Sequence, residues 1–230
     1  MSEAVALVQA RMGSTRFPGK MLAPLGGRPI LEWVLLRASQ SQLLSKVVLA
    51  TTNLERDDEL VRIAERVGID VYRGSESDVL ERFVLAAKKY GADPVVRICA
   101  DNPFIDPREI DRLVHFFQAN QCDYACNHQA RLGNQYADGF GAEILSSDLL
   151  IKLGNIAVDM RHREHVTTYL WDNFDEFNLK VVFPPPGLDQ PDLRFDIDTL
   201  ADYEYMESLV LKGVGINMAA PHIIALALDK

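Results

Sequence analysis

Short apolar runs alternate with segments of helical spacing over the first hundred residues, and this alternation limits the possible folds most strongly. The runs, rich in β-branched residues, are residues 4–9, 46–51, 69–72 and 94–99. The segments between them, with apolar residues at helical spacing, are residues 30–39, 56–67 and 78–90. Strands that alternate with helices predict an α/β fold: a mostly parallel sheet between two layers of helices.

The second half of the chain is less regular. Asp106 followed by Pro107 marks a helix start, since Asp caps helices and Pro fits their first turn. We expect strands at residues 122–126, 177–183 and 194–198, and helices at residues 145–153, 161–173 and 199–212. Residues 127–140 are polar and too long for a tight turn. We therefore expect one domain over residues 1–230, with an inserted arm around residues 127–185.

Composition excludes several classes of protein. The formal net charge of −9 and the pI of about 5.0 argue against a nucleic-acid partner. No apolar stretch approaches the length of a membrane span, and the N-terminus has no basic leader, so we expect a cytoplasmic protein without a membrane partner. Cys99, Cys122 and Cys126 lack the further ligands of a zinc site, and we expect them to be reduced and mostly buried, with Cys99 in the core.

A basic, glycine-containing stretch follows the first strand. It reads QARMGSTRFPGKML and carries Arg11, Arg16 and Lys20. The carboxyl edge of a parallel sheet is where such sheets bind ligands, and these cations suit a phosphate chain there. The spacing is neither that of a P-loop nor that of a dinucleotide-binding turn. The alternative is a solvated turn whose basic side chains pair with surface acids.

Two aspartates are expected at the same edge. Asp101 ends the fourth strand and Asp198 ends a late one. Mg²⁺ takes one or two protein carboxylates and leaves its other positions to phosphates and water. Each residue alone would more often be a helix cap; together with the basic stretch they indicate metal-assisted phosphoryl chemistry.

Motifs along nearly the whole chain resemble the cytidylyltransferases that activate acidic sugars as CMP-sugars, in particular their spore-coat polysaccharide branch. In order, the motifs are QARMGSTRFPGKML, LATT, RGSESDVLERF, RICADNPFIDPREID, DGFGAEIL, REHVTTYL and DIDTLADYEY. The resemblance implies a Rossmann-like nucleotidyltransferase fold, CTP and Mg²⁺ as co-reactants, and a homodimer. It also implies that a sugar hydroxyl attacks the α-phosphorus of CTP and that pyrophosphate leaves.

The resemblance also assigns residues to roles. The catalytic group is Arg11, Lys20, Asp101 and Asp198, of which Asp101 and Asp198 hold the metal. The nucleotide-binding group is Arg11, Gly13, Ser14, Arg16, Lys20, Thr51, Arg73 and Ala100. This chain has Ala100 where a glycine is usual, and TLAD where TPED is usual.

Candidates for contacts to the sugar lie in the loop and the arm: His128, Arg131, Asn134, Gln135, Asp138, Glu143, Arg161, Arg163 and His165. We assign substrate binding to Asp138, Glu143, Arg163 and His165. An arginine or a protonated histidine suits a substrate carboxylate. The structural alternatives are a satisfied helical histidine for His165 and a hairpin turn around Asp138 and Glu143.

Other functions remain open. The same fold could use another nucleoside triphosphate, or it could be a GT-A-like glycosyltransferase, for which Asp196 and Asp198 would supply an Asp-x-Asp pair. A third possibility is an inactive homologue that binds a nucleotide. The acceptor sugar, a nonulosonic acid or a 3-deoxy-manno-octulosonate-like acid, is not determined by spacing or charge.

Overall fold

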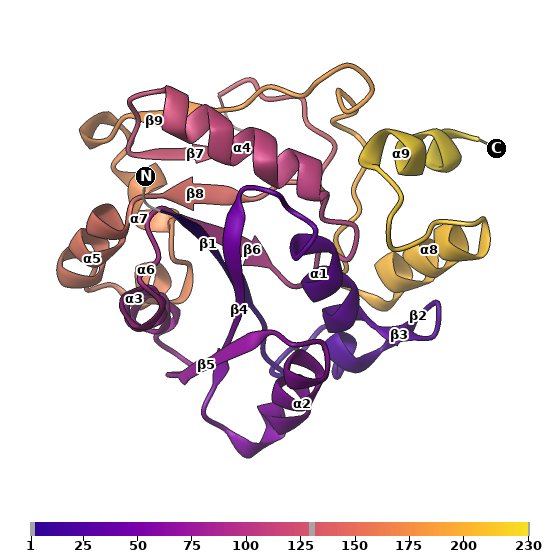
Figure 1. The fold of residues 1–230 in the computed structure, drawn as a ribbon, viewed down its shortest axis with the longest axis horizontal. Coiled ribbons are helices and arrows are strands. Elements are labelled where there is room, and N and C mark those ends of the chain that lie inside the picture. The colour runs from indigo at the N-terminus through magenta and orange to yellow at the C-terminus, as the bar shows by residue number, and fades with distance from the viewer. Residues whose placement is uncertain (1–2, 129–131, 230) are drawn as a thin grey trace.

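A twisted seven-stranded sheet forms the centre of the computed structural model, which describes residues 3–128 and 132–229 (Figure 1). In spatial order its strands are β5 (Asp70–Gly74), β4 (Leu44–Thr52), β1 (Ala4–Gln9), β6 (Val95–Cys99), β8 (Glu143–Leu145), β7 (Tyr124–Cys126) and β9 (Leu179–Val181). Strands β5, β4, β1 and β6 pair in parallel, as do β7 and β9, and β8 runs antiparallel to both of its neighbours. The prediction of a mostly parallel sheet is confirmed.

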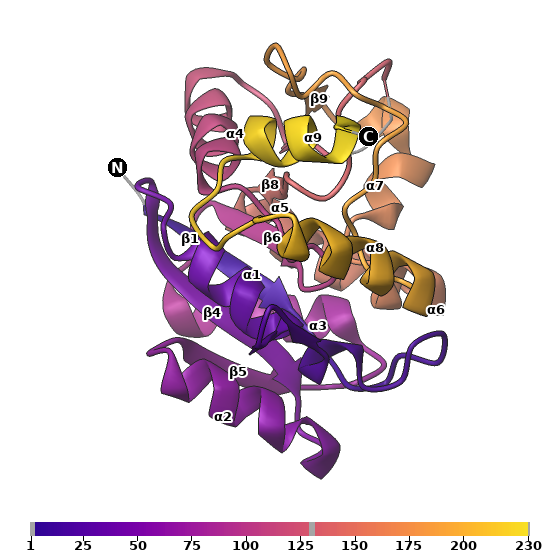
Figure 2. The same ribbon diagram turned by 90° about the vertical axis from the view of Figure 1, so that its right-hand side faces the viewer.

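Helices cover both faces of the sheet (Figures 1 and 2). One face packs against α1 (Ile30–Ala38), α2 (Asp58–Arg66), α4 (Pro107–Ala119), α8 (Leu200–Leu211) and α9 (Ala220–Leu228). The other carries α3 (Val79–Tyr90), α5 (Ser147–Ile156), α6 (Met160–Glu164) and α7 (Thr168–Asp172). Shorter elements are η1 (Lys20–Leu22), η2 (Glu55–Asp57), η3 (Phe174–Glu176) and the hairpin of β2 (Pro24–Leu25) and β3 (Arg28–Pro29). Alternating strand residues point to opposite faces, so each side of the sheet has its own apolar core.

Local capping sets the helix ends that the sequence predicts. The Asp106 carboxylate accepts the Arg108 amide at 2.9 Å and starts α4, with Pro107 at its first position. Thr199 and Asp202 form a reciprocal capping box that starts α8. These starts agree with the expected helices.

Three sequence expectations need correction. The helix expected over residues 161–173 is two helices, α6 and α7, because the backbone leaves the helical region at His165 (φ −111°, ψ 85°). Residues 194–198 form a single bridge to Asp138 in place of a strand. The helix expected at residue 145 begins at Ser147, because the Ser146 hydroxyl caps the Leu149 amide at 3.2 Å and residues 143–145 belong to β8.

The segment expected as an inserted arm contributes to the sheet itself. Within residues 127–185, β8 lies between β6 and β7, and β9 lies at the sheet edge. Side chains from this segment therefore reach the ends of the central strands. Within residues 3–128 and 132–229, no helix is both long and apolar enough to cross a membrane.

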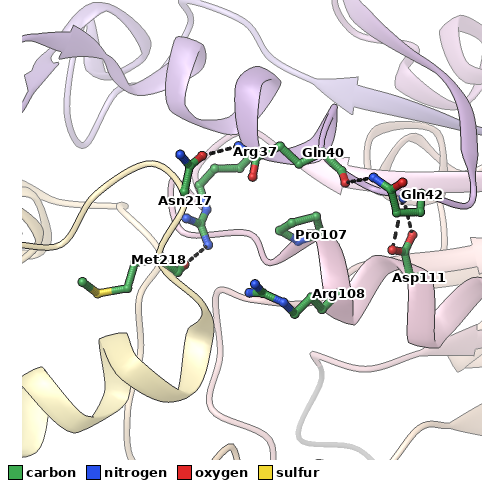
Figure 3. Close-up of a pocket in the computed structure, with 8 residues that line it drawn as sticks. All are labelled: Arg37, Gln40, Gln42, Pro107, Arg108, Asp111, Asn217 and Met218. Carbon is green, nitrogen blue, oxygen red and sulfur yellow. Dashed lines mark hydrogen bonds between the residues drawn. The ribbon is translucent and has the colours of Figure 1, made fainter.

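A buried arginine joins distant parts of the chain. Arg37, at the C-terminal end of α1, is 1% exposed, and burial lowers its pKa to about 10. Its guanidinium donates hydrogen bonds to five backbone carbonyls, those of Phe104, Ile105, Gly215, Ile216 and Met218. Arg37 borders a cavity of about 230 Å³ that also touches Arg108 and Asp111. Figure 3 shows the residues that line it. Arg37 thus ties α1 to the segments before α4 and α9.

Candidate active site

The larger cavity opens at the carboxyl ends of β1 and β6, where parallel sheets bind ligands. Its volume is about 460 Å³, within the range of small-molecule sites. The residues expected from the sequence that line it are Arg11, Gly13, Ser14, Arg16, Lys20, Ala100, Asp101, His165 and Asp198. Residues almost two hundred positions apart thus share one cavity.

The basic loop (residues 10–20) is held by hydrogen bonds from neighbouring strands and turns. The Met12 amide donates to the Asp57 carboxylate at 2.8 Å, and the buried Asp57 also accepts the Thr52 hydroxyl. Inside the loop, the Ser14 hydroxyl oxygen accepts the Phe17 amide at 3.3 Å. Gly13 passes close to Glu76, whose Oε1 would lie 3.2 Å from an added Cβ. These contacts fix the path of the loop.

Lys20 lies between the two expected metal ligands. Its side chain is 11% exposed, and Nζ donates to the Ile197 carbonyl at 2.7 Å. The same Nζ lies 3.4 Å from Asp198 Oδ1 and 3.6 Å from Asp101 Oδ2. The two carboxylates are thus neighbours, as the sequence predicts.

The other two loop cations also have acidic partners. Arg11 Nη2 lies 2.7 Å from Glu164 Oε1, and its Nη1 donates to the Glu76 carbonyl at 3.1 Å. Arg16 Nη2 lies 2.9 Å from Asp198 Oδ1, with a side chain that is 66% exposed. Anionic phosphates would therefore compete with protein carboxylates for these cations.

The two aspartates suit a hard divalent cation. Burial raises the pKa of Asp101, and Asp198 and Asp196 raise it further against the opposing effect of Lys20. Crowded carboxylates of this kind favour a bound cation. Among the described residues, no three His, Cys, Asp or Glu side chains form a metal cage. Two carboxylates with phosphate and water oxygens match the way Mg²⁺ is held.

Cys99 was expected in the core, but it lines this cavity and is only half-buried. It lies at the end of β6, paired in register with Gln9. Burial raises the pKa of its thiol to about 12, so it is a neutral thiol and not a nucleophile at neutral pH.

Two residues expected at the nucleotide lie outside the cavity lining. Thr51 is fully buried in β4, where it pairs with Arg73 of β5. The Arg73 guanidinium donates to the carbonyls of Thr52 and Leu54, each at 2.9 Å, and contacts Asp58 at 2.8 Å. In this structure, Arg73 fixes the turn after β4.

Three residues expected at the sugar also lie outside the lining. The Asp138 side chain is 39% exposed, and the Asp138 backbone forms an isolated β-bridge with Arg194. Burial raises the pKa of Asp138, against the opposing effect of His128. Glu143 is fully buried, and Arg163 joins α6 to the start of α3 through Asp78 at 2.5 Å.

The remaining sugar candidates are dispersed. Asn134 is buried, Gln135 bonds to neighbouring carbonyls of its own loop, and Arg161 pairs with Asp172 at 2.5 Å. His128 lies near both Asp138 and Glu143. Arg131 lies outside the described residues.

Sequence reasoning missed three residues around the cavity. Glu164 and Arg97 line it, and Asp57 supports the basic loop from behind. Arg97 and Glu164 stand in the motifs RICADNPFIDPREID and REHVTTYL but received no role there, and Arg97 is also a charge inside the otherwise apolar strand VVRIC. No signal marked Asp57, which resembles an ordinary turn acid.

A mostly parallel sheet that carries a basic loop after β1 and two adjacent carboxylates at the same edge defines the Rossmann-like nucleotidyltransferases. The family model described as "Cytidylyltransferase" matches residues 5–219. The chain belongs to this family.

Individual relatives agree with this placement. The chain is 34% identical over 234 residues to the spore coat polysaccharide biosynthesis protein SpsF of Bacillus subtilis, covering 98% of this chain and 94% of SpsF. A 3-deoxy-manno-octulosonate cytidylyltransferase of Bdellovibrio bacteriovorus is 40% identical over 116 residues, covering 49% of this chain and 45% of that enzyme. The structure of a cytidylyltransferase from Leptospira borgpetersenii superposes with a TM-score of 0.91 at 33% identity, covering 98% of this chain and 94% of that one.

Proposed function

We propose that this cytidylyltransferase transfers CMP from CTP to an acidic sugar and releases pyrophosphate. The observation that carries the proposal is that the loop cations Arg11, Arg16 and Lys20 share one cavity with the adjacent carboxylates Asp101 and Asp198. The cations suit a triphosphate and the carboxylates suit its metal. Similarity to a 3-deoxy-manno-octulosonate cytidylyltransferase supports an acidic acceptor.

In this reaction a sugar hydroxyl oxygen forms a bond to the α-phosphorus while the bond from that phosphorus to the bridging oxygen of pyrophosphate breaks. The hydroxyl proton leaves to solvent, and pyrophosphate carries away the electron pair. Arg11, Arg16 and Lys20 hold the phosphates and stabilise the charge that builds on the leaving group. The ordered basic loop limits the reorganisation that this step needs.

Asp101 and Asp198 would hold Mg²⁺. When bound, the ion neutralises phosphate charge and so favours attack on phosphorus. Lys20, which contacts both carboxylates, would then be free to bond to phosphate oxygens.

A GT-A-like glycosyltransferase is less well supported. Its Asp-x-Asp pair would need the carboxylates of both Asp196 and Asp198. Both oxygens of Asp196 instead accept hydrogen bonds from Arg194, at 3.0 and 2.6 Å. Asp198 and Asp101 both line the cavity and share Lys20, whereas Asp196 is not part of the lining, so we pair Asp198 with Asp101.

Pyrophosphate release tests the proposal. The purified protein with Mg²⁺ should release pyrophosphate with CTP and an acidic sugar, and much less with UTP, GTP or ATP. The acceptor panel is N-acetylneuraminate, legionaminate, pseudaminate and 3-deoxy-manno-octulosonate, with neutral hexoses as controls. Equal rates with another nucleotide would contradict the choice of base. Nucleotide binding without turnover on any acceptor would favour an inactive homologue.

We also propose that the protein is a homodimer through the connection between α5 and α6. Val158 in this connection is 88% exposed, and Met160, the first residue of α6, is 65% exposed. Replacing both by aspartate should convert a dimer to a monomer in light scattering after size exclusion, because paired apolar side chains would become charged. Leu211→Asp, at an equally exposed position on α8, is the control and should leave the mass unchanged. A monomeric wild type would contradict the proposal.

A further inference from the structure

An ion pair lies beside the active-site cavity, with Arg97 in the cavity lining and Glu143 behind it. Arg97 on β6 points to the same face as Val95, and its partner in register on β1 is the fully buried Leu7. Its guanidinium contacts the fully buried Glu143 of β8 at 2.9 Å. A buried ion pair is seldom retained for stability, because desolvation of both charges offsets their attraction. The pair therefore calls for a functional explanation.

Both residues of the pair have further hydrogen-bond partners, and Arg97 still has N–H groups available for a ligand. Arg97 Nη2 donates to Gln9 Oε1 at 3.2 Å, and Glu143 accepts the Thr167 hydroxyl at 3.3 Å. Burial works to raise the pKa of Glu143, but Arg97 and then His128 outweigh it and hold that pKa below its ordinary value. Each Nη of Arg97 carries two N–H groups, and Nη1 donates to Glu143 while Nη2 donates to Gln9. The guanidinium therefore keeps N–H groups beyond these two bonds with which to bind an anion.

The position of Arg97 separates it from the other cations of the cavity. Arg11, Arg16 and Lys20 all come from the basic loop, whereas Arg97 comes from β6, four residues before Asp101. The side chain is 12% exposed and lines the cavity floor. The proposed function assigns the triphosphate to the loop cations, so Arg97 is available for the second substrate.

We propose that Arg97 binds the carboxylate of the acceptor and thereby selects sugar acids over neutral sugars, with Glu143 as its positioning residue. The inference rests on the proposed function. In a cyclic 2-keto sugar acid, the carboxylate and the anomeric hydroxyl are attached to the same carbon. A guanidinium that holds the carboxylate therefore also places the attacking hydroxyl, beside Asp101 and the phosphate site.

The test replaces both partners together, as Arg97→Gln with Glu143→Gln, so that no unpaired charge is buried. Binding of N-acetylneuraminate and 3-deoxy-manno-octulosonate, each against its carboxamide, is measured by calorimetry with a non-hydrolysable CTP analogue present. The wild type should prefer each acid by about 30- to 100-fold, as expected for a charge-assisted hydrogen bond, and the double variant by less than about 3-fold. The affinity for the CTP analogue should stay unchanged.

Two further variants keep the test decisive. Arg112→Gln with Glu109→Gln removes a comparable ion pair on α4, outside the cavity, and should retain the wild-type preference. If the double variant at the cavity floor does not fold, Arg97→Lys keeps the charge but loses the fork, and the preference should fall about tenfold. In Glu143→Gln alone, KM for the acid should rise while kcat and KM for CTP stay near wild type.

The outcomes separate the two proposals. A variant without Arg97 that still prefers the acid would overturn the role of Arg97 and leave the proposed function intact. A wild type that binds CTP but neither binds nor uses any sugar acid would overturn the proposed function, and the role of Arg97 with it.

Discussion

Asp198→Asn should lower kcat for pyrophosphate release by about 10³-fold or more, since one of the two carboxylates proposed to hold the metal is replaced by a neutral amide. The fold should persist, because the backbone at this position is held by the Asp198 amide, which donates to Asp202 at 3.0 Å. The measurement is steady-state release of pyrophosphate at saturating CTP, together with the Mg²⁺ concentration at half-maximal rate. Circular dichroism confirms that the variant is folded.

Asp196→Asn is the matched control for this variant. Asp196 lies two residues earlier, carries the same side chain and is bound by Arg194 in place of the cavity cations. Its substitution should change kcat by no more than about threefold, because Asp196 is not part of the cavity lining and its carboxylate is held by Arg194. Equal losses in both variants would contradict the pairing of Asp198 with Asp101 and favour an Asp-x-Asp metal site.

Arg37→Met should lower the free energy of unfolding by roughly 3–4 kcal/mol without a specific effect on the active site. The substitution retains most of the side-chain volume but removes the donors to five backbone carbonyls. Each buried acceptor left without a donor costs about 1 kcal/mol or more, and water from the adjacent cavity can satisfy some of them. Urea unfolding measures the change.

Arg108→Met provides the comparison for Arg37, because Arg108 lines the same cavity with a side chain that is 66% exposed. Its removal should cost less than about 0.5 kcal/mol, as for other surface substitutions. A loss of stability in the Arg108 variant equal to that of the Arg37 variant would show that the carbonyl contacts are not the source.

Periodicity and capping predicted the parallel half of the sheet well. The four early strands and three intervening helices lie within about two residues of their expected bounds, because each is specified by local signals such as the Asp78 cap of α3. The basic loop and the two aspartates also meet as expected, since the ends of parallel strands share one edge.

Contacts between distant segments were harder to predict. Strand β8 has only three residues and is defined by pairing with β6 and β7, so no local pattern revealed it. The same pairing buries Glu143 against Arg97, which moves Glu143 from an expected sugar contact to a position behind the cavity floor. For Arg73, the motif match assigned a contact to the nucleotide. In the structure its guanidinium donates instead to carbonyls in the turn after β4.

If the cavity binds a triphosphate and a divalent ion as proposed, its ion pairs predict that the two ligands bind cooperatively. Arg16 and Lys20 pair with Asp101 and Asp198 in this structure. A triphosphate that draws these cations away exposes the carboxylates to a divalent ion, and an ion at the carboxylates releases the cations to phosphate. Because coupling between two sites is reciprocal, nucleotide and ion should each raise the affinity for the other by the same factor. The protein would then discriminate against free nucleotide and free metal alike, and its true substrate would be their complex.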